Sequence, residues 1–174
     1  MEFVAWSVHK YIMHSESNIV GKWHLIHHKH TKQDMSLDTS GEDYNEILPN
    51  ENIVIDDAYS LVAIGAFAII IPYIFHKIYP VELNLWVLWA FGLFLSVYSI
   101  LIWNSIHGYI HYRDAQQMGS FSLCNKNTKL LADNSSFIRW LIENHKKHHT
   151  FKGPQKGNYN ITLPGADFIL GTYN

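Results

Sequence analysis

The sequence has only one cysteine, Cys124, among its 174 residues. A single cysteine cannot form an internal disulfide, so the chain is not a disulfide-stabilised scaffold and fits a reducing compartment. An excess of charge is missing too: the formal net charge is −2, whereas nucleic-acid-binding proteins usually present a basic surface. A G-x-G-x-x-G fingerprint for a flavin or nicotinamide is also absent, so electrons for any redox chemistry must come from another molecule.

Charge is missing altogether from two long stretches. Residues 58–75 and 85–106, which are 18 and 22 residues long, contain no Asp, Glu, Lys or Arg. As helices they would span about 27 and 33 Å, close to the roughly 30 Å of a membrane's hydrocarbon core. Neither stretch alternates with period two, which favours helix over strand. Two buried helices of a soluble bundle are the alternative interpretation, and the length of the second stretch favours the membrane.

The short linker at residues 76–84 predicts a transmembrane hairpin, which returns the chain to the side that it left. Residues 1–57 and 107–174 would then lie on one face of the membrane. Twelve of the 13 Lys and Arg are on these two arms and only Lys77 is in the turn, so the positive-inside rule predicts cytoplasmic arms. We therefore expect an all-α, integral-membrane helical bundle, a single domain over residues 1–174, with a cytoplasmic helical cap. Its membrane would be the endoplasmic reticulum of a eukaryote or the inner membrane of a bacterium.

Histidine, by contrast, is abundant. There are 12 histidines, and ten of them fall into four short groups with the spacing of metal ligands. Residues i, i+3 and i+4 of an α-helix share one face, so each H-x2-H-H group is expected to offer three imidazoles to one point, and H-x3-H two. The four groups are His9 and His14; His24, His27 and His28; His107 and His111; and His145, His148 and His149.

These ten imidazoles are too many for one ion, since a structural zinc takes four ligands and a catalytic zinc usually three. We predict two metal ions with about five histidines each, all ten being metal-binding and catalytic residues. His9 and His14 are five residues apart and need a bend to share an ion. His30 points away from His28 on its helix and His76 lies in the hairpin turn, so neither is interpreted as a ligand. Imidazole suits zinc, copper, iron and nickel, so the ligands alone do not name the metal.

The order of the histidine groups resembles that of the fatty acid hydroxylase superfamily. Its members are integral-membrane, non-haem di-iron oxygenases. "EFVAWSVHKYIMHS" at residues 2–15, followed by "WHLIHH" at 23–28, is similar to the front half of β-carotene hydroxylases. "HGYIH" at 107–111 is similar to the third group of fatty acid 2-hydroxylases. The end of the chain resembles fatty acid 2-hydroxylases and sterol desaturases, in which N-Y-G and D-x-x-x-G-T follow the last histidines; the matching residues are Asn158, Tyr159, Asp167, Gly171 and Thr172.

The resemblance implies an O2-dependent lipid hydroxylase, or monooxygenase, whose ten histidines hold two iron ions that zinc can replace in purified material. Its partners would be the membrane, a lipid substrate and an electron donor such as cytochrome b5 or a ferredoxin, but no nucleic acid. A fatty acyl chain, a sterol and a carotenoid all stay open as substrates. A lipid desaturase of the same superfamily and a non-catalytic, histidine-rich metal-binding membrane protein are the alternatives.

Carboxylates close to the histidine groups in sequence are candidates to orient the ligands. Individually, each is interpreted as a solvated acid or a helix cap. The polar segment at residues 113–136 is predicted to be a connecting loop. The four candidate carboxylates are Asp57, Asp114, Glu143 and Asp167.

Overall fold

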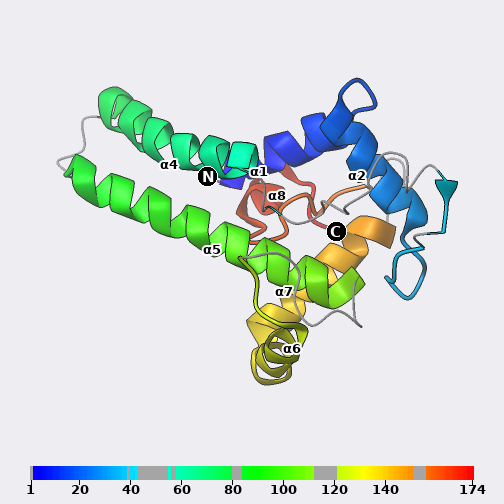
Figure 1. Cartoon of the computed structure of the whole chain (residues 1–174). Helices are drawn as coiled ribbons and strands as arrows, with labels where there is room; N and C mark the ends of the chain where they lie inside the picture. The colour runs from blue at the N-terminus through cyan, green and yellow to red at the C-terminus, as the bar shows by residue number, and fades with distance from the viewer. Residues whose placement is uncertain are drawn as a thin grey trace.

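The structure is a computed structural model that describes residues 2–38, 40–42, 55, 58–79, 84–111, 121–150 and 156–174. The predicted all-α class is confirmed, since the only β pairing in these ranges is an isolated bridge between Thr31 and Leu37. Figure 1 shows a long helical pair that extends from a cluster of shorter helices. The helices are α1 (Glu2–Ser7), the π-helix η1 (Val8–Met13), α2 (Ile19–His30), α4 (Ala58–Ile78), α5 (Leu85–His111), α6 (Asn125–Asn134), α7 (Ser136–Thr150) and α8 (Gly165–Leu170).

The two long helices coincide with the two uncharged stretches. α4 has 21 residues and α5 has 27, and both are long and apolar enough to cross a membrane. Only 6% and 11% of their most apolar windows is buried inside the protein. The core helix of a soluble bundle would bury most of its apolar surface, so the low burial favours the membrane interpretation over the soluble one.

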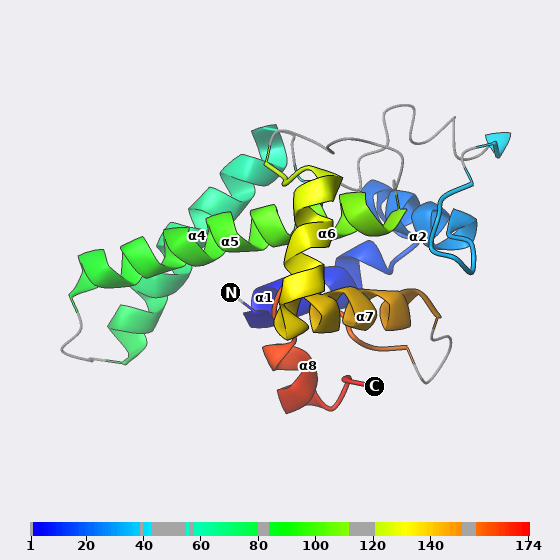
Figure 2. The same ribbon diagram turned by 90° about the horizontal axis from the view of Figure 1, so that it is seen from below.

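The long helices touch where a glycine lets their backbones approach. α4 and α5 cross obliquely in Figure 2. A Cβ added to Gly92 would lie 2.6 Å from the carbonyl oxygen of Ala68 and 3.1 Å from the ring of Pro72. Small residues at such crossings are typical of membrane helix pairs, because close backbone contact replaces hydrophobic burial as the source of packing energy. Glycine at position 92 therefore lets α4 and α5 pack closely at this point.

The prediction of a loop over residues 113–136 is wrong in part, because α6 occupies Asn125–Asn134. Asn125, Thr128 and Ala132 are buried, and their spacing places them on one helical face. That face packs against α5 and α7. The helix buries small and polar side chains, so its amphipathic pattern is hard to recognise from apolar residues.

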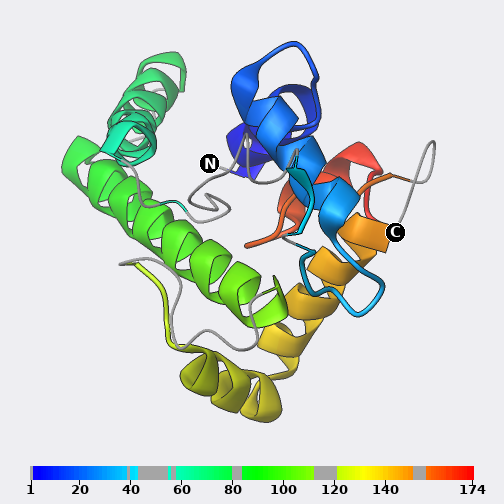
Figure 3. The same cartoon turned by 45° about the vertical axis from the view of Figure 1, so that its right-hand side comes forward.

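The core lies where the shorter helices meet the C-terminal end of α5. Ile106 and Ile110 of α5 pack with Leu141 and Ile142 of α7 and with Ile161. Figure 3 shows these helices gathered around that end of α5, away from its N-terminal end. α5 continues to His111, so the helix that is apolar enough to cross a membrane also carries two of the predicted ligands.

Candidate metal centre

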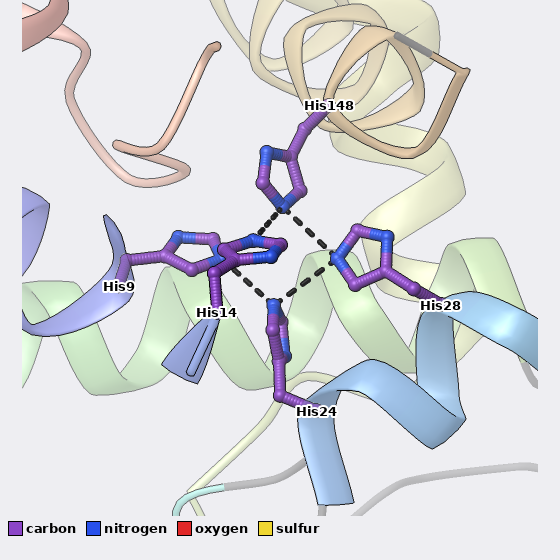
Figure 4. A group of neighbouring side chains, drawn as sticks. All are labelled: His9, His14, His24, His28 and His148. Atoms are coloured by element: carbon purple, nitrogen blue, oxygen red, sulfur yellow. Dashed lines mark hydrogen bonds between the residues drawn. The ribbon is translucent and has the colours of Figure 1, made fainter. Parts of the chain in front are cut away.

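The first histidine group consists of His9, His14, His24, His28 and His148, which come from η1, its C-cap, α2 and α7. One nitrogen of each ring lies within 4.8 Å of the corresponding nitrogen of every other ring. Figure 4 shows the five rings converging on one point. The Nε2 atom of His24 lies 2.9 Å from that of His9 and 3.1 Å from that of His28. The Nε2 atom of His148 lies 3.1 Å from that of His28 and 3.2 Å from that of His14.

The second histidine group consists of His27, His107, His111, His145 and His149. Ligand atoms of four of them lie within 4.8 Å of one another. The fifth, His145, places its Nε2 atom 3.2 Å from those of His111 and His149. The rings of His28 and His149 stack with centroids 4.2 Å apart, so the two groups are direct neighbours.

The expectation that each H-x2-H-H group serves one point is wrong. In α2, His24 and His28 belong to the first group and His27 to the second. In α7, His148 belongs to the first group, whereas His145 and His149 lie in the second. The reason is helical geometry: residues i and i+4 differ by about 40° around the axis, and residue i+3 is rotated about 60° the other way. Each helix therefore supplies a pair to one group and a single ring to the other.

The predicted bend between His9 and His14 is a π-helix. η1 covers Val8–Met13, and the backbone N–H of His14 donates to the carbonyl of His9 across five residues, at 3.2 Å. The i→i+5 bond of a π-helix aligns residues five apart, and such turns are frequent at functional sites. The two rings consequently stack, with an angle of 18° between their planes.

The start of α2 is pressed against the end of η1. The Asn18 side chain accepts the N–H of Gly21 at 2.8 Å and donates to the carbonyl of Ile12 at 2.9 Å. A Cβ on Gly21 would overlap the carbonyl oxygen of Ser15. Glycine at this position thus lets α2 approach closely enough for His24 and His28 to meet the η1 histidines.

Backbone carbonyls fix three of the rings. Nδ1 of His9 contacts the Tyr159 carbonyl at 2.5 Å, and Nδ1 of His148 contacts the Gly157 carbonyl at 2.8 Å. In the second group, Nδ1 of His111 contacts the Met35 carbonyl at 2.6 Å. A carbonyl can only accept, so each Nδ1 carries the proton and each Nε2 presents its lone pair to the group centre. Metal-ligating histidines are typically oriented in this way.

Burial keeps the imidazoles in their neutral form. Desolvation, followed by the effect of His14, lowers the pKa of His9 from 6.5 to about 3. Desolvation, followed by neighbouring histidines, also holds the pKa values of His24, His27 and His148 well below 6.5. A neutral imidazole has a free lone pair, which is the state that binds a metal.

Hydrogen bonds alone cannot satisfy the first group. A neutral imidazole has one N–H and one lone pair, so an Nε2 that donates cannot also accept. His9 and His148 hold their protons on Nδ1 and therefore only accept at Nε2. The other three rings have at most three protons for four Nε2–Nε2 contacts. At least one close contact lacks a proton, and a cation shared by all five lone pairs removes this conflict.

In the second group, too, hydrogen bonds leave ring nitrogens unsatisfied. Within the described residues, neither ring nitrogen of His27 or of His107 has a hydrogen-bond partner, although all four atoms are buried. A buried polar group without a partner costs about 1–3 kcal/mol. A metal ion supplies the missing partner, so both groups fit bound metal. Their donors are all imidazoles, which suit zinc, copper, iron or nickel.

Asp167 supports the first group without contacting it. Its buried carboxylate accepts the backbone N–H of Tyr159 at 3.0 Å and of Asn160 at 2.6 Å, and the Thr172 hydroxyl at 2.6 Å. These bonds hold the backbone segment whose Tyr159 carbonyl accepts a hydrogen bond from His9. Glu143 is exposed and pairs with Lys146 at 2.6 Å, as expected of a solvated acid. Candidates Asp57 and Asp114 lie outside the described residues.

Several supporting groups have no counterpart in the sequence analysis. Every residue has a carbonyl, so no side-chain pattern marks those of Met35, Gly157 and Tyr159. The only residue type in this segment that hints at an unusual backbone is Asn158. It has a φ of 56°, which asparagine tolerates better than most residues. Trp103 is another such group, since its ring contacts those of His9 and His107 at centroid distances of 5.8 and 4.2 Å.

A mostly apolar cavity of about 690 Å³ adjoins the histidines, a volume typical of small-molecule sites. His9, His24 and His107 form part of its wall. From there it follows α4 and α5 toward their crossing, where Phe67 and Ser96 line it. His107 and Ser96 are 11 residues apart on α5, so the cavity extends for roughly 16 Å along that helix.

No protein-family model, curated protein or solved structure matches the chain. The candidate site therefore rests on its own geometry. All ten predicted ligands fall into the two histidine groups, whereas His30 and His76 belong to neither group within the described part of the chain.

Proposed function

We propose that the protein is a membrane-bound, non-haem di-iron oxygenase that hydroxylates an unactivated C–H bond of a lipid substrate, as members of the fatty acid hydroxylase superfamily do. One observation carries this proposal: two adjacent groups of five imidazoles border an apolar cavity beside helices that can cross a membrane.

In this proposal each histidine group holds one iron ion. Two bound irons would supply the redox chemistry that reduces O2 and removes hydrogen from the substrate, with electrons from an external donor such as cytochrome b5 or a ferredoxin. Five donors exceed the four of a closed structural zinc site. An all-imidazole site with this many ligands therefore favours a redox metal over a structural one.

The chain's own residues bind and orient the substrate. The cavity excludes water with side chains such as Val8, Ile64 and Ile100, and an apolar chain entering it would reach His9, His24 and His107. Trp103 packs against two of these histidines and lines the cavity beside them. The substrate can enter from the lipid, because α4 and α5 supply one side of the cavity.

The proposed orientation places the histidine groups on the cytoplasmic face. Twelve of the 13 Lys and Arg lie on the two arms that carry them, in agreement with the positive-inside rule. A soluble electron donor would reach the arms from that side.

The test is turnover with isotopically labelled O2. Iron-loaded protein in detergent is mixed with a reductant and a set of acyl lipids, sterols and carotenoids, and the products are analysed by mass spectrometry. We expect a product that carries the labelled oxygen. His148→Ala should abolish it, whereas His30→Ala, on α2 but outside both groups, should retain it.

Two other outcomes of this assay would favour the alternative functions. A product with a new double bond and no labelled oxygen would identify a desaturase. Fully loaded protein that forms no product from any lipid, with an active reductant, would contradict the oxygenase proposal and favour a metal-binding protein without this activity.

A further inference from the structure

A single carboxyl group lies in the wall of the apolar cavity. Among the described residues that line it, Glu2 is the only acid, and no Lys or Arg is present. The Asn160 side chain donates to the Glu2 carboxylate at 2.7 Å and to the Glu2 carbonyl at 3.0 Å. Asn160 is itself 1% exposed, so a buried amide fixes both the backbone and the side chain of Glu2.

The described residues do not fill the hydrogen-bonding capacity of this pair. Asn160 donates to one Glu2 oxygen, and the other accepts no hydrogen bond from the described residues. The Asn160 side-chain oxygen is also buried without a partner among them. Burial of the Glu2 carboxyl raises its pKa to about 7, partly offset by the hydrogen bond from Asn160 and by the positive charge of the N-terminal amine. Near neutral pH, the group can therefore both donate and accept.

The pair is held at a set distance from the histidines. Glu2 precedes His9 by seven residues along α1 and η1, which corresponds to roughly 10 Å. Consecutive residues of one segment hold both positions, because Tyr159 accepts from His9 and Asn160 donates to Glu2. A molecule bound at Glu2 would thus present a carbon several bonds away to the rings.

We propose that Glu2 is the specificity-determining residue of the cavity, and that it hydrogen-bonds a hydroxyl or another neutral polar group at one end of an otherwise apolar substrate. This inference rests on the proposed function for the reaction, but recognition at Glu2 is a separate property. A hydroxyl can use the unfilled capacity of Glu2 and Asn160. A plain hydrocarbon would leave it unfilled, and a carboxylate would face an acid with no Lys or Arg among the described residues that line the cavity.

The test compares three probes with chains of equal length: a long-chain alcohol, the matching carboxylate and the matching alkane, each brominated near its far end. Bromine quenches tryptophan fluorescence, and Trp23 and Trp103 line the cavity. Binding is measured in detergent on the protein as purified, without reductant. We expect the alcohol to bind about tenfold more tightly than the other two probes, the effect of one good hydrogen bond to an ionisable group.

Two variants locate the effect. Glu2→Leu should remove the preference of alcohol over alkane, and Glu2→Gln, which keeps the shape, should reduce the discrimination against the carboxylate. Glu143→Gln changes an exposed acid of α7 outside the cavity and should leave all three affinities unchanged. Equal binding of alcohol and alkane by the unaltered protein, or an unchanged preference in Glu2→Leu, would overturn the inference. Because no turnover occurs in this assay, such a failure leaves the labelled-oxygen result standing, and the reverse also holds.

Discussion

Both histidine groups contain five imidazoles, but the chain supports the two groups differently. In the first group, His9 and His148 are anchored on carbonyls of a single segment, residues 157–159. In the second, His111 is anchored on Met35, whereas His27 and His107 have no hydrogen-bond partner among the described residues. The backbone therefore orients the first group in advance, and we expect the second to depend more on a bound ion.

Substitution of neighbouring histidines in α2 should give the largest difference between the two groups. His24→Ala removes one of five rings from the first group and His27→Ala one from the second, so each variant should bind one of the two proposed metal ions more weakly and retain about one ion per chain after purification. Metal analysis of detergent-purified protein measures this. His30→Ala, on the same helix, should bind as much metal as the unaltered chain. A loss of the same ion in both variants would show that the division into two groups is wrong.

Acid should destabilise the buried histidines of both groups, because desolvation lowers the pKa of His27 in the second group as well as those of the first. Desolvation lowers the pKa of His9 to about 3 and that of His14 to about 2, from 6.5 in the unfolded chain. Below 6.5 the unfolded chain binds protons that the folded protein does not, so stability is complete above that pH and falls as the pH drops. Each such histidine removes about 1.4 kcal/mol per pH unit. Thermal melting of metal-free protein from pH 7.5 to 5.5 should therefore show a decreasing midpoint, and a constant midpoint would contradict the neutral, buried state.

Asp167→Asn should weaken metal binding by the first group only, because Asp167 supports the segment at residues 157–160. The amide cannot accept all three hydrogen bonds of the carboxylate, so the carbonyl that receives His9 loses its support. Loss of such outer support typically costs about 10- to 100-fold in metal affinity. We expect chelator competition to reveal this loss for one ion and not for the other.

The control for Asp167→Asn is Glu143→Gln, which removes an exposed acid and should change neither ion. Circular dichroism checks that both variants keep their helices. Equal weakening of both ions would mean that Asp167 stabilises the whole fold, and that the difference in support between the groups is not real.

The smallest expected effect is a difference in melting temperature between two variants of the metal-free protein, one from each group. His107→Leu removes two buried nitrogens that lack partners, each costing about 1–3 kcal/mol, so its melting temperature should stay equal or rise. His9→Leu instead leaves the Tyr159 carbonyl without its donor, and its melting temperature should fall. The opposite order would contradict the claim that the second group depends on its ion.

The helical fold and the clustering of ten histidines were predictable from the sequence, because long uncharged stretches and helically spaced histidines are both local signals. Two uncharged stretches indicate α4 and α5, and histidines at helical spacing indicate the ten rings. The membrane face, which rests on the distribution of Lys and Arg, stays a prediction.

The assignment of rings to groups was not predictable. Whether His27 joins His24 or faces α5 depends on the relative position of α2, α5 and α7, which no local spacing contains. The π-helix at Val8–Met13 likewise follows from tertiary packing, since a five-residue spacing alone indicates only a mismatch with the α-helix. The α6 helix was missed because it buries Asn125 and Thr128 instead of large apolar residues.

The most direct test of two histidine-bound metal ions is the metal content per chain of the detergent-purified protein, with the His148→Ala, His149→Ala double variant beside it. Because the double variant removes one ligand from each group, we predict about two equivalents of metal in the unaltered protein, mainly iron, and loss of both ions in the variant. Less than about one equivalent of any metal in the unaltered protein, or full retention in the double variant, would contradict the two-metal centre.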